Sequence, residues 1–410
     1  MSRVLLLLPV AGYAGEDYAA AADRLNIELI VCADYCHRLA PSWGLPPLMS
    51  VPFDQPELAL PQVLNQLKGP VNAVLAVDDH GLALAACLRE RLGLPGNSPH
   101  AVMQLADKLM FRQLQQGIVL PHPAFYWLRH DDELHAAASA VHFPLVVKAR
   151  RLNASRGVIR ADNADELHAA VHTVRRIQSR LQRDADNLGL LVEAFIPGEE
   201  VALEGVLQGG ALRVLAVFDK PDPLNGPNFE ERRYVTPSRL PDPVQSAIAE
   251  DVSLACAAAG VTEGPIHAEA RINDQGVWLL EIAPRAIGGL CGRVLQAAVG
   301  MDATELVLRH ATGLPLPDVA QQADAAGVMM IPIPATGILK SVEGIEAARD
   351  IPYISGIEIT ARNGQLIAPP PEGASYLGFI FSRAPSPEAA GNALLAAHSQ
   401  LVIHIQATFP

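Results

Sequence analysis

The chain is poor in charge, in aromatic side chains and in cysteine, and these shortages narrow the classes of protein it can belong to. Of its 410 residues only 18% are charged and 5% are aromatic, whereas 50% are apolar. Its 31 Lys and Arg residues stand against 44 Asp and Glu residues, which gives a formal charge of −13. The basic residues form no dense block of the kind that follows a phosphate backbone, so nucleic acid is not expected as a partner.

Cysteines and long apolar runs are also scarce. Five cysteines, mostly far apart, do not make a disulfide framework, so we expect reduced thiols and a cytoplasmic location. No apolar run reaches the roughly 18 residues that a membrane-spanning helix needs, and no membrane partner is expected. The apolar run at 3–10 is short and ends in a Gly-containing turn, which predicts a buried strand rather than a secretion signal.

Two common nucleotide-binding motifs are absent. No G-x-G-x-x-G follows a predicted strand, which argues against a dinucleotide-binding oxidoreductase. No G-x-x-x-x-G-K-[ST] is present either, which excludes an ordinary P-loop.

The order of apolar and polar segments predicts a mixed α/β and α+β protein with two or three globular cores. Residues 1–100 alternate strands with helices in the βαβ pattern of a small parallel, Rossmann-like domain, and 327–405 form a compact α+β unit. In the first region we expect strands at 4–8, 28–32 and 73–77 and helices at 18–25 and 81–92. Between the two regions we expect helices at 101–116 and 164–186, a strand at 145–148, and strand-rich stretches at 190–217 and 266–282.

The first candidate site element is a lysine at a strand end. Lys148 closes the predicted strand, and a small basic loop follows it at 150–158. In this loop Ser155 and Gly157 can bring a hydroxyl and a backbone N–H close to phosphate oxygens. Taken alone, a strand-end lysine is more often a surface residue.

The second element is the segment 192–204. Glu193, Phe195 and Glu200 surround a Pro-Gly turn and offer acceptors at a spacing that suits an adenine amino group and a ribose diol. A turn beside a solvated acidic edge is the alternative interpretation.

The third element, at 264–289, is the strongest. Strand alternation places His267, Glu269 and Arg271 on one face. A three-residue hairpin loop at 274–276 would pair Asn273 with Val277 and set Glu269 opposite Glu281, whereas a four-residue loop would put these acids on opposite faces.

Two carboxylates that face each other repel unless a cation neutralises them. With phosphate nearby, Mg²⁺ is the expected ion, and Mn²⁺ is an alternative. The charged guanidinium group of Arg285 can bind a phosphoryl group or a carboxylate through two hydrogen bonds. Gly288 and Gly289 let the chain approach a ligand closely.

Together these segments resemble the ATP-grasp superfamily. Its motifs occur in the same order: Lys108 in ADKLMFRQ, Lys148 with RRLNASRGV, Glu193 with PGEE, and the acids of HAEAR and LLEIAPRAIGG. The likeness covers nearly the whole chain. Residues 1–100 resemble the pre-ATP-grasp domain, 101–325 the ATP-grasp domain with 122–188 as its lid, and 326–410 the accessory domain of carboxylate–amine ligases, including L-amino-acid (dipeptide) ligases.

The resemblance implies a role for each matched residue. It places Lys108 and Lys148 on the phosphates of ATP, Glu193 at adenine, Glu200 at ribose, Glu269 and Glu281 on Mg²⁺, and Arg285 at the acyl phosphate. Two positions depart from the family pattern. Ala283 stands where Asn often adds a metal ligand, and in the segment 226–240 Glu231 fits a substrate-binding acid while Tyr234 replaces a common His.

The implied activity joins a small carboxylate, expected to be an amino acid, to an amine through an acyl phosphate, with release of ADP and phosphate. A carboxylating relative of the biotin-carboxylase or purine-biosynthesis type would use the same ATP site with bicarbonate. A nonenzymatic nucleotide-binding protein is a third interpretation. Such a chain could assemble as a homodimer.

Overall fold

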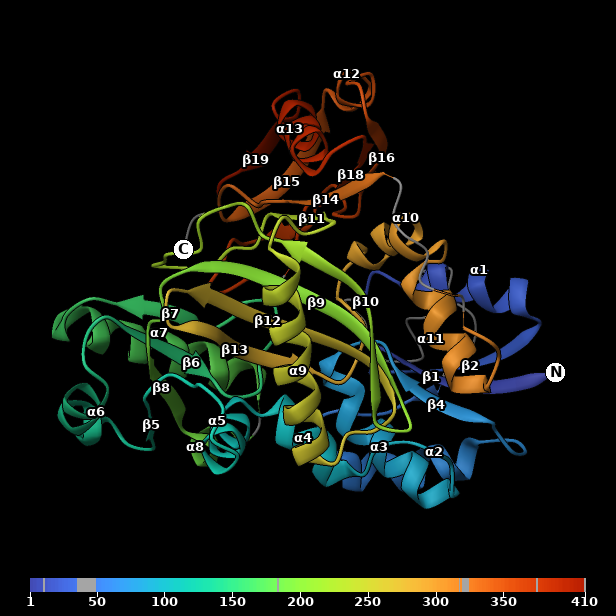
Figure 1. Ribbon diagram of the computed structural model, residues 1–410, viewed down its shortest axis with the longest axis horizontal. Coiled ribbons are helices and arrows are strands. Elements are labelled where there is room, and N and C mark those ends of the chain that lie inside the picture. Colours follow the sequence, from blue (N-terminus) through green and yellow to red (C-terminus); the bar gives the residue numbers. More distant parts are fainter. Residues whose placement is uncertain are drawn as a thin grey trace.

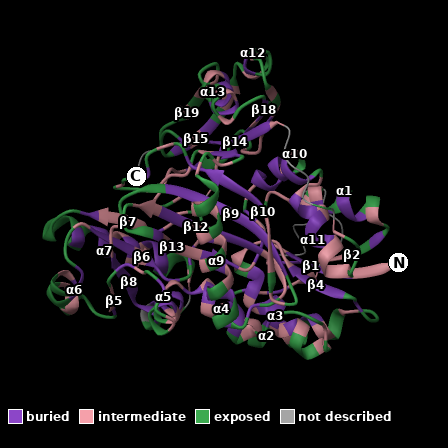
Figure 2. Ribbon diagram, viewed as in Figure 1, coloured by how far each residue is buried: buried purple, intermediate pink, exposed green. Residues whose placement is uncertain are grey.

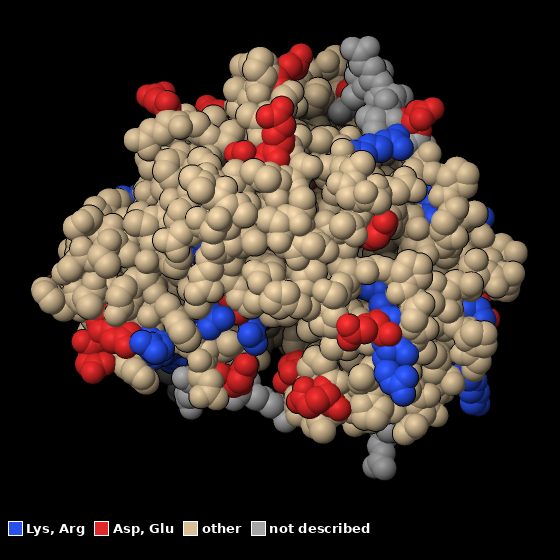
Figure 3. All heavy atoms as spheres, turned by 60° about the horizontal axis from the view of Figure 1, so that its bottom comes forward, with Lys and Arg blue, Asp and Glu red and all other residues tan. Residues whose placement is uncertain are grey.

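The computed structural model describes residues 1–9, 12–34, 49–182, 184–316, 318, 324–373 and 375–408. Within these residues the strands form four sheets. Figure 1 shows them arranged around four long strands near the centre of the molecule, β9 (Glu199–Gln208), β10 (Ala211–Asp219), β12 (Gly264–Asn273) and β13 (Gly276–Ala283). No described helix is long and apolar enough to cross a membrane. On the face drawn in Figure 3, basic side chains lie among acidic ones.

The N-terminal region is a parallel sheet in the order β3–β2–β1–β4, as the βαβ pattern predicts. Strand β1 (Ser2–Leu8) is apolar throughout its centre because both faces are covered: Leu5 and Leu7 face one hydrophobic core and Val4 and Leu6 another. The other elements of the region are α1 (Gly15–Leu25), β2 (Ile27–Ala33), β3 (Met49–Ser50), α2 (Pro56–Gln66), β4 (Ala73–Ala76) and α3 (Asp79–Leu92).

The single helix expected over 101–116 is wrong, because the structure has two helices, α4 (Pro99–Ala106) and α5 (Lys108–Gly117). Asp107 separates them. Its backbone is extended, and its carboxylate accepts hydrogen bonds from the N–H groups of Leu109 and Met110. A side chain that caps a new helix in this way competes with continuation of the old one, and here it sets Lys108 at the start of α5.

The second sheet is antiparallel and has the order β5–β8–β6–β7. Its core face packs against α6 (Leu134–Val141) and α7 (Ala164–Leu181). Its strands are β5 (Phe125–Leu128), β6 (Leu145–Ala149), β7 (Val158–Ala161) and β8 (Leu190–Ala194). Strand β8 lies beyond the expected lid boundary at 188, yet it pairs with both β5 and β6. The expected helix over 164–186 ends at Leu181, and a short helix, α8 (Ala185–Leu188), follows.

The third sheet is antiparallel and has eight strands in the order β13–β12–β9–β10–β11–β14–β18–β16. Because β11 pairs with β14, one sheet continues across the expected domain boundary at 326. Figure 2 shows the long strands at its centre largely buried. The strands are β9 (Glu199–Gln208), β10 (Ala211–Asp219), β11 (Arg233–Thr236), β12 (Gly264–Asn273), β13 (Gly276–Ala283), β14 (Ala325–Ile331), β16 (Ile354–Ile359) and β18 (Gly378–Ala384).

Helices cover both faces of this sheet. Helix α9 (Asp242–Ala259) packs into the core under β12 and β13, while α10 (Leu295–Val299) and α11 (Ala303–Thr312) pack on the other side. A three-stranded sheet in the order β17–β15–β19 completes the C-terminal region. Its strands are β15 (Gly337–Glu343), β17 (Leu366–Ile367) and β19 (Val402–Gln406), and α12 (Ile345–Arg349) and α13 (Pro387–His398) lie beside it.

Candidate functional site

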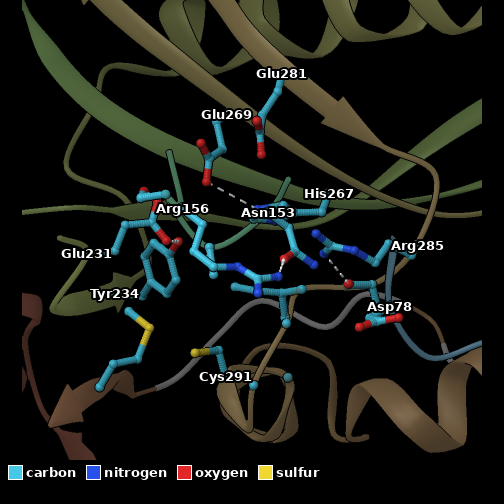
Figure 4. Close-up of a pocket in the computed structure, with 18 of the residues that line it drawn as sticks. Asp78, Asn153, Arg156, Glu231, Tyr234, His267, Glu269, Glu281, Arg285 and Cys291 are labelled. Atoms are coloured by element: carbon cyan, nitrogen blue, oxygen red, sulfur yellow. Dashed lines mark hydrogen bonds and ion pairs between the residues drawn. The ribbon is translucent and has the colours of Figure 1, made fainter. Parts of the chain in front are cut away.

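A cavity of about 470 Å³ lies between the N-terminal region, the second sheet and the eight-stranded sheet, and the C-terminal region closes it with Tyr376. The structure brings to it all of the residues singled out from the sequence except Gly157. Those that line it are Lys108, Lys148, Ser155, Glu193, Phe195, Glu200, Glu231, Tyr234, Glu269, Glu281, Arg285, Gly288 and Gly289. Figure 4 shows several of them pointing toward one another.

The hairpin of β12 and β13 sets Glu269 opposite Glu281, as expected, but not through the expected loop. Asn273 pairs with Gly276 across a two-residue turn, so the predicted three-residue loop is wrong. The Asn273 side chain accepts a hydrogen bond from the N–H of Gln275 at 2.9 Å, which stabilises this tighter turn.

A β-bulge sets Glu269 opposite Glu281 in spite of the shorter turn. From the turn, the pairing would set Glu269 against Leu280, but the register shifts between Glu269 and Ala270, and Leu280 becomes the extra residue. Glu269 therefore meets Glu281 on the cavity side, and Ala268 and Ala270 face the hydrophobic core under α9. The alternation predicted for β12 is confirmed.

One end of the cavity holds a buried ionic group. The Glu193 carboxylate, 2% exposed, contacts Lys148 and accepts hydrogen bonds from Nε and Nη2 of Arg112 at 2.8 and 3.3 Å. Burial alone would raise the pKa of Glu193, but Arg112 and Lys148 outweigh it and lower the pKa to about 2. Burial lowers the pKa of Lys148, although the neighbouring Glu193 carboxylate acts to raise it. Val146 and Phe195 give the same end apolar walls, which suit a flat heterocycle.

A second ionic group centres on Lys220, which directly follows β10. Its side chain is 2% exposed, and its Nζ lies 2.9 Å from Glu200 Oε1, 2.9 Å from Glu269 Oε1 and in contact with Glu231. The ring of Tyr234 lies 5.2 Å from the same nitrogen. Burial lowers the pKa of Lys220, but the three carboxylates outweigh burial and hold the pKa well above its usual value. Lys220 is therefore charged and holds together three acids that would otherwise repel one another.

Glu231 and Tyr234 extend this group along the cavity. The Tyr234 hydroxyl donates a 2.7 Å hydrogen bond to Glu231 Oε2. Burial and the neighbouring Glu269 raise the pKa of Glu231. The tyrosine found where a histidine was expected thus acts as a donor to the acid three residues before it.

His267 joins the acidic group to β9 (Figure 4). Its Nδ1 contacts Glu204, and its Nε2 lies 3.4 Å from Glu269 Oε1. Burial lowers the pKa of His267, but Glu204 and Glu269 outweigh it and raise the pKa to about 10, so the ring is an imidazolium at neutral pH. The other oxygen of Glu204 accepts the N–H of Ile287 at 3.1 Å, which fixes the segment that carries Arg285.

The opposed acids fit a divalent cation. Glu281 Oε2 lies 3.1 Å from Lys108 Nζ, and its side chain is 28% exposed. Glu269 contacts Lys220 and His267, so each acid already carries a counter-charge. Among the described residues, carboxylate oxygens of Glu200, Glu231 and Glu269 also lie within 4.8 Å of one another. Since Lys220 already bridges that trio, the pair Glu269 and Glu281 is the better place for a metal ion.

The loop after Lys148 lies over the cavity. Ser155 lines the cavity and has a positive φ of 55°, which makes a tight turn of the loop. Gly157 does not line the cavity, and its N–H donates to the carbonyl of Pro371 at 3.2 Å. The C-terminal region thus already uses this N–H, and the expectation that it meets a phosphate stays a prediction. Lys108 Nζ donates to the Leu152 carbonyl at 2.8 Å and ties the loop to α5.

Arg285 is buried beside the N-terminal region. Its Nη2 lies 2.5 Å from Asp79 Oδ2, and the same oxygen accepts a 3.1 Å hydrogen bond from Asn153 of the loop. Burial would lower the pKa of Arg285, but Asp79 outweighs it, so the side chain is a fixed cation. Gly288 has open space around it, whereas a Cβ on Gly289, at φ 64°, would lie 2.9 Å from the Phe379 ring. Only glycine fits that second position.

The sequence analysis missed several residues that the structure places in or beside the cavity. Lys220 ends a strand in the same way as Lys148, and this signal was available. Asp78 and Asp79 follow β4 at the carboxyl end of a parallel sheet, where ligands commonly bind. Arg112, Asn153 and Arg156 lie in the segments ADKLMFRQ and RRLNASRGV that the sequence analysis singled out, but no pattern in the sequence distinguishes them from their neighbours.

The geometry defines a class of protein: a nucleotide-sized cavity between two antiparallel sheets, with paired acids, two lysines from separate elements and a glycine-rich closing segment. A family model of the ATP-grasp domain matches residues 141–294, and a model of the L-amino acid ligase C-terminal domain 2 matches residues 329–406. The chain therefore contains an ATP-grasp domain and, after it, a C-terminal domain of the L-amino acid ligase type.

Individual proteins support this assignment. Carnosine synthase 1 of Gallus gallus is 31% identical over 63% of this chain, but the match spans only 30% of that protein. D-alanine–D-alanine ligase of Pseudomonas putida strain GB-1 is 29% identical over 54% of this chain and 69% of that protein. The crystal structure of L-amino acid ligase from Bacillus licheniformis superposes with a TM-score of 0.83 at 24% identity and covers 99% of both chains, which establishes the shared fold.

Proposed function

We propose that this protein is an ATP-dependent carboxylate–amine ligase that forms an amide bond through an acyl phosphate and releases ADP and phosphate. The observation that carries the proposal is the opposed pair Glu269 and Glu281, which shares one cavity with Lys108, Lys148 and Arg285. Two acids for a metal ion and three cations for phosphate and carboxylate oxygens are the parts that phosphoryl transfer to a carboxylate needs.

The positions of these groups suggest how the first step proceeds. Adenine would lie against Val146 and Phe195, beside the ionic group of Glu193, and Glu200 would face the ribose. Lys108 and Lys148 would bind phosphate oxygens. A divalent ion, Mg²⁺ or Mn²⁺, would be held by Glu269 and Glu281 and would neutralise the developing phosphate charge. The substrate carboxylate then attacks the γ-phosphorus in line, which gives the acyl phosphate and ADP.

The second step needs an orienting cation and the exclusion of water. Arg285, fixed by Asp79, would hold an oxygen of the acyl phosphate, while the loop at 150–158 covers the cavity. The amine nitrogen attacks the carbonyl carbon, the bond from carbon to the phosphate oxygen breaks, and inorganic phosphate leaves. The extra proton of the nitrogen passes to the leaving phosphate, and the amide remains.

The C-terminal region favours amide formation over carboxylation. Residues 329–406 match the C-terminal domain of L-amino acid ligases, and carnosine synthase 1 and D-alanine–D-alanine ligase are among the proteins to which this chain is similar. The partners proposed are therefore a small carboxylate, most simply an amino acid, and an amine. The reduced state of the described cysteines is compatible with the cytoplasm as the place of action.

Product analysis tests the proposal. The protein is incubated with Mg-ATP and pools of amino acids and other small carboxylic acids, with ADP, AMP and phosphate measured and the condensed product identified by mass. Substrate-dependent formation of ADP and an amide is expected. Turnover that depends on bicarbonate would instead support a carboxylating enzyme, and formation of AMP would contradict both.

A further inference from the structure

Arg156 is the exception among the cations of the cavity. The other lysine and arginine side chains that line it in the described part of the chain each have a carboxylate within ion-pair distance. Arg156 has none there. A cation kept from water without a counter-charge is costly, so this position favours an anionic ligand.

The surroundings of Arg156 place it away from the nucleotide end. Its Nη2 donates a hydrogen bond to the Asn153 side-chain oxygen at 3.1 Å, and its Nε is buried without a partner among the residues that the structure describes. Figure 4 shows the side chain reaching from beside Tyr234 toward Asn153, with Arg285 on the far side. Lys108 and Lys148 already serve the phosphate region, so Arg156 is free for another anion.

A carboxylate without a direct ion-pair partner in the described ranges lines the same cavity as Arg156. Asp78 lines the same cavity at the start of α3, where its Oδ1 accepts the N–H of His80 at 3.0 Å. The charge of Asp78 acts on Arg156, yet no ion pair joins Asp78 to any described residue within 4.0 Å. The cavity wall therefore presents a cation and an anion, and neither neutralises the other by direct contact. That arrangement is complementary to a zwitterion, which carries a carboxylate and an ammonium group.

Building on the ligase function proposed above, we propose that Arg156 binds the carboxylate of the acceptor, so that the attacking amine is an amino acid. Its ammonium group faces Asp78, and that carboxylate takes the proton which the nitrogen must lose before it attacks. A simple amine would leave Arg156 unpaired. The donor carboxylate is a separate group, because it must reach the transferred phosphoryl group near Arg285 and the opposed acids. Arg156 is thus a specificity-determining residue for the acceptor and not for the donor.

The test compares matched acceptors in the full-length protein. Each L-amino acid that the wild type accepts is assayed beside its own carboxamide, and hydroxylamine serves as a nucleophile that captures the acyl phosphate without any carboxylate. We expect the free acid to exceed the carboxamide in kcat/KM by about tenfold to hundredfold, the range for a charge-assisted hydrogen bond. Equal use of acid and carboxamide by the wild type, or acceptance of carboxylate-free amines alone, would overturn the inference.

Substitution of the arginine completes the comparison. In Arg156→Gln the preference for the free acid over its carboxamide should fall to about twofold or less, and the ratio of amide to hydroxamate formed should drop by the same factor. Arg156→Lys should keep part of the preference. Arg180→Gln, which removes the same charge from an exposed position on α7, should leave both ratios at the wild-type value.

Three failures are distinguishable. If the wild type forms neither ADP nor hydroxamate with any carboxylate, the proposed ligase function fails, and the inference fails with it. If Arg156→Gln lowers hydroxamate formation as much as amide formation, Arg156 acts on the transferred phosphoryl group, and the inference alone is overturned. If Arg156→Gln keeps the wild-type preference for the free acid, Arg156 does not bind the carboxylate of the acceptor.

Discussion

Glu269 and Glu281 lie directly opposite each other on β12 and β13, and each contacts a different lysine: Glu269 contacts Lys220 at 2.9 Å and Glu281 contacts Lys108 at 3.1 Å. The two lysines come from separate elements, since Lys108 begins α5 and Lys220 follows β10. The acids are thus counter-charged before any ligand enters. We expect Lys108 to exchange Glu281 for phosphate oxygens when ATP and a metal ion bind, because the ion then neutralises the acid pair.

The first prediction concerns the metal ion. Glu281→Gln keeps the size of the side chain and removes one charge of the pair, so turnover should fall by about hundredfold, with the half-maximal Mg²⁺ concentration raised several-fold. ADP release is measured across a Mg²⁺ titration. Glu343→Gln removes the same charge from a side chain that is 66% exposed, and it should behave as wild type. An unchanged Mg²⁺ dependence in Glu281→Gln would remove this acid from the metal site.

The second prediction concerns Lys220. Lys220→Met leaves Glu200, Glu231 and Glu269 without their shared cation, so the free energy of unfolding should fall by about 3 kcal/mol or more. Urea unfolding at neutral pH measures this loss. Lys340→Met, at an exposed position of β15, serves as the matched control and should change the midpoint little. If both variants unfold at the wild-type midpoint, Lys220 does not hold the acids together.

Most of the site could be predicted because its residues belong to a few continuous segments. Strand alternation was enough to place Glu269 and Arg271 on one face, and the hairpin was enough to suggest that Glu269 meets Glu281. The route to that pairing was not predictable, because a two-residue turn plus a bulge gives the same partner as a three-residue loop without one. Turn length and bulges depend on local side-chain bonds, such as that of Asn273, which the pattern of apolar residues does not report.

Contacts between distant segments could not be predicted. Asp79 and Arg285 are 206 residues apart, and only the packing of the N-terminal region against the eight-stranded sheet brings them to 2.5 Å. The break at Asp107 was missed because its flanking residues continue the helical spacing, while its capping role appears only in the folded chain. The backbone freedom of Gly157 suggested that its N–H could bind a phosphate. In the folded chain this N–H donates to the carbonyl of Pro371, a residue far away in the sequence.

The third prediction distinguishes the role of Lys148 from that of Arg112, the two cations that contact Glu193. Lys148→Met should lower turnover by about hundredfold and weaken ATP binding, because the lysine lines the cavity while Arg112 still neutralises Glu193. Arg112→Met should instead lower stability more than Lys148→Met, because Arg112 also bonds Gln115 at 2.7 Å and the Leu280 carbonyl at 2.8 Å. Steady-state kinetics and thermal midpoints of both variants check the contrast. The reverse order of effects would exchange the structural and functional assignments.

The last prediction uses the same carboxylate as a pH probe. The pKa of Glu193 is about 2 in the folded protein and near the ordinary glutamate value of 4.5 when unfolded, so the folded state favours the ionised form. A depressed pKa means that this contribution is fully present above pH 4.5 and is lost as the pH falls from 4.5 toward 2. The shift corresponds to about 3 kcal/mol of stability at neutral pH.

Urea midpoints of the wild type and Glu193→Gln, taken from pH 7 down to pH 3, test this contribution. Because other carboxylates also titrate in this range, the difference between the two proteins is the informative quantity. That difference should shrink as the pH falls below 4.5, since the wild type alone loses the contribution of the ionised carboxylate. Glu346→Gln, at a side chain that is 83% exposed, should differ from the wild type by a small and nearly constant amount. A gap for Glu193→Gln that stays constant from pH 7 to pH 3 would mean that Arg112 and Lys148 do not lower the pKa of this acid.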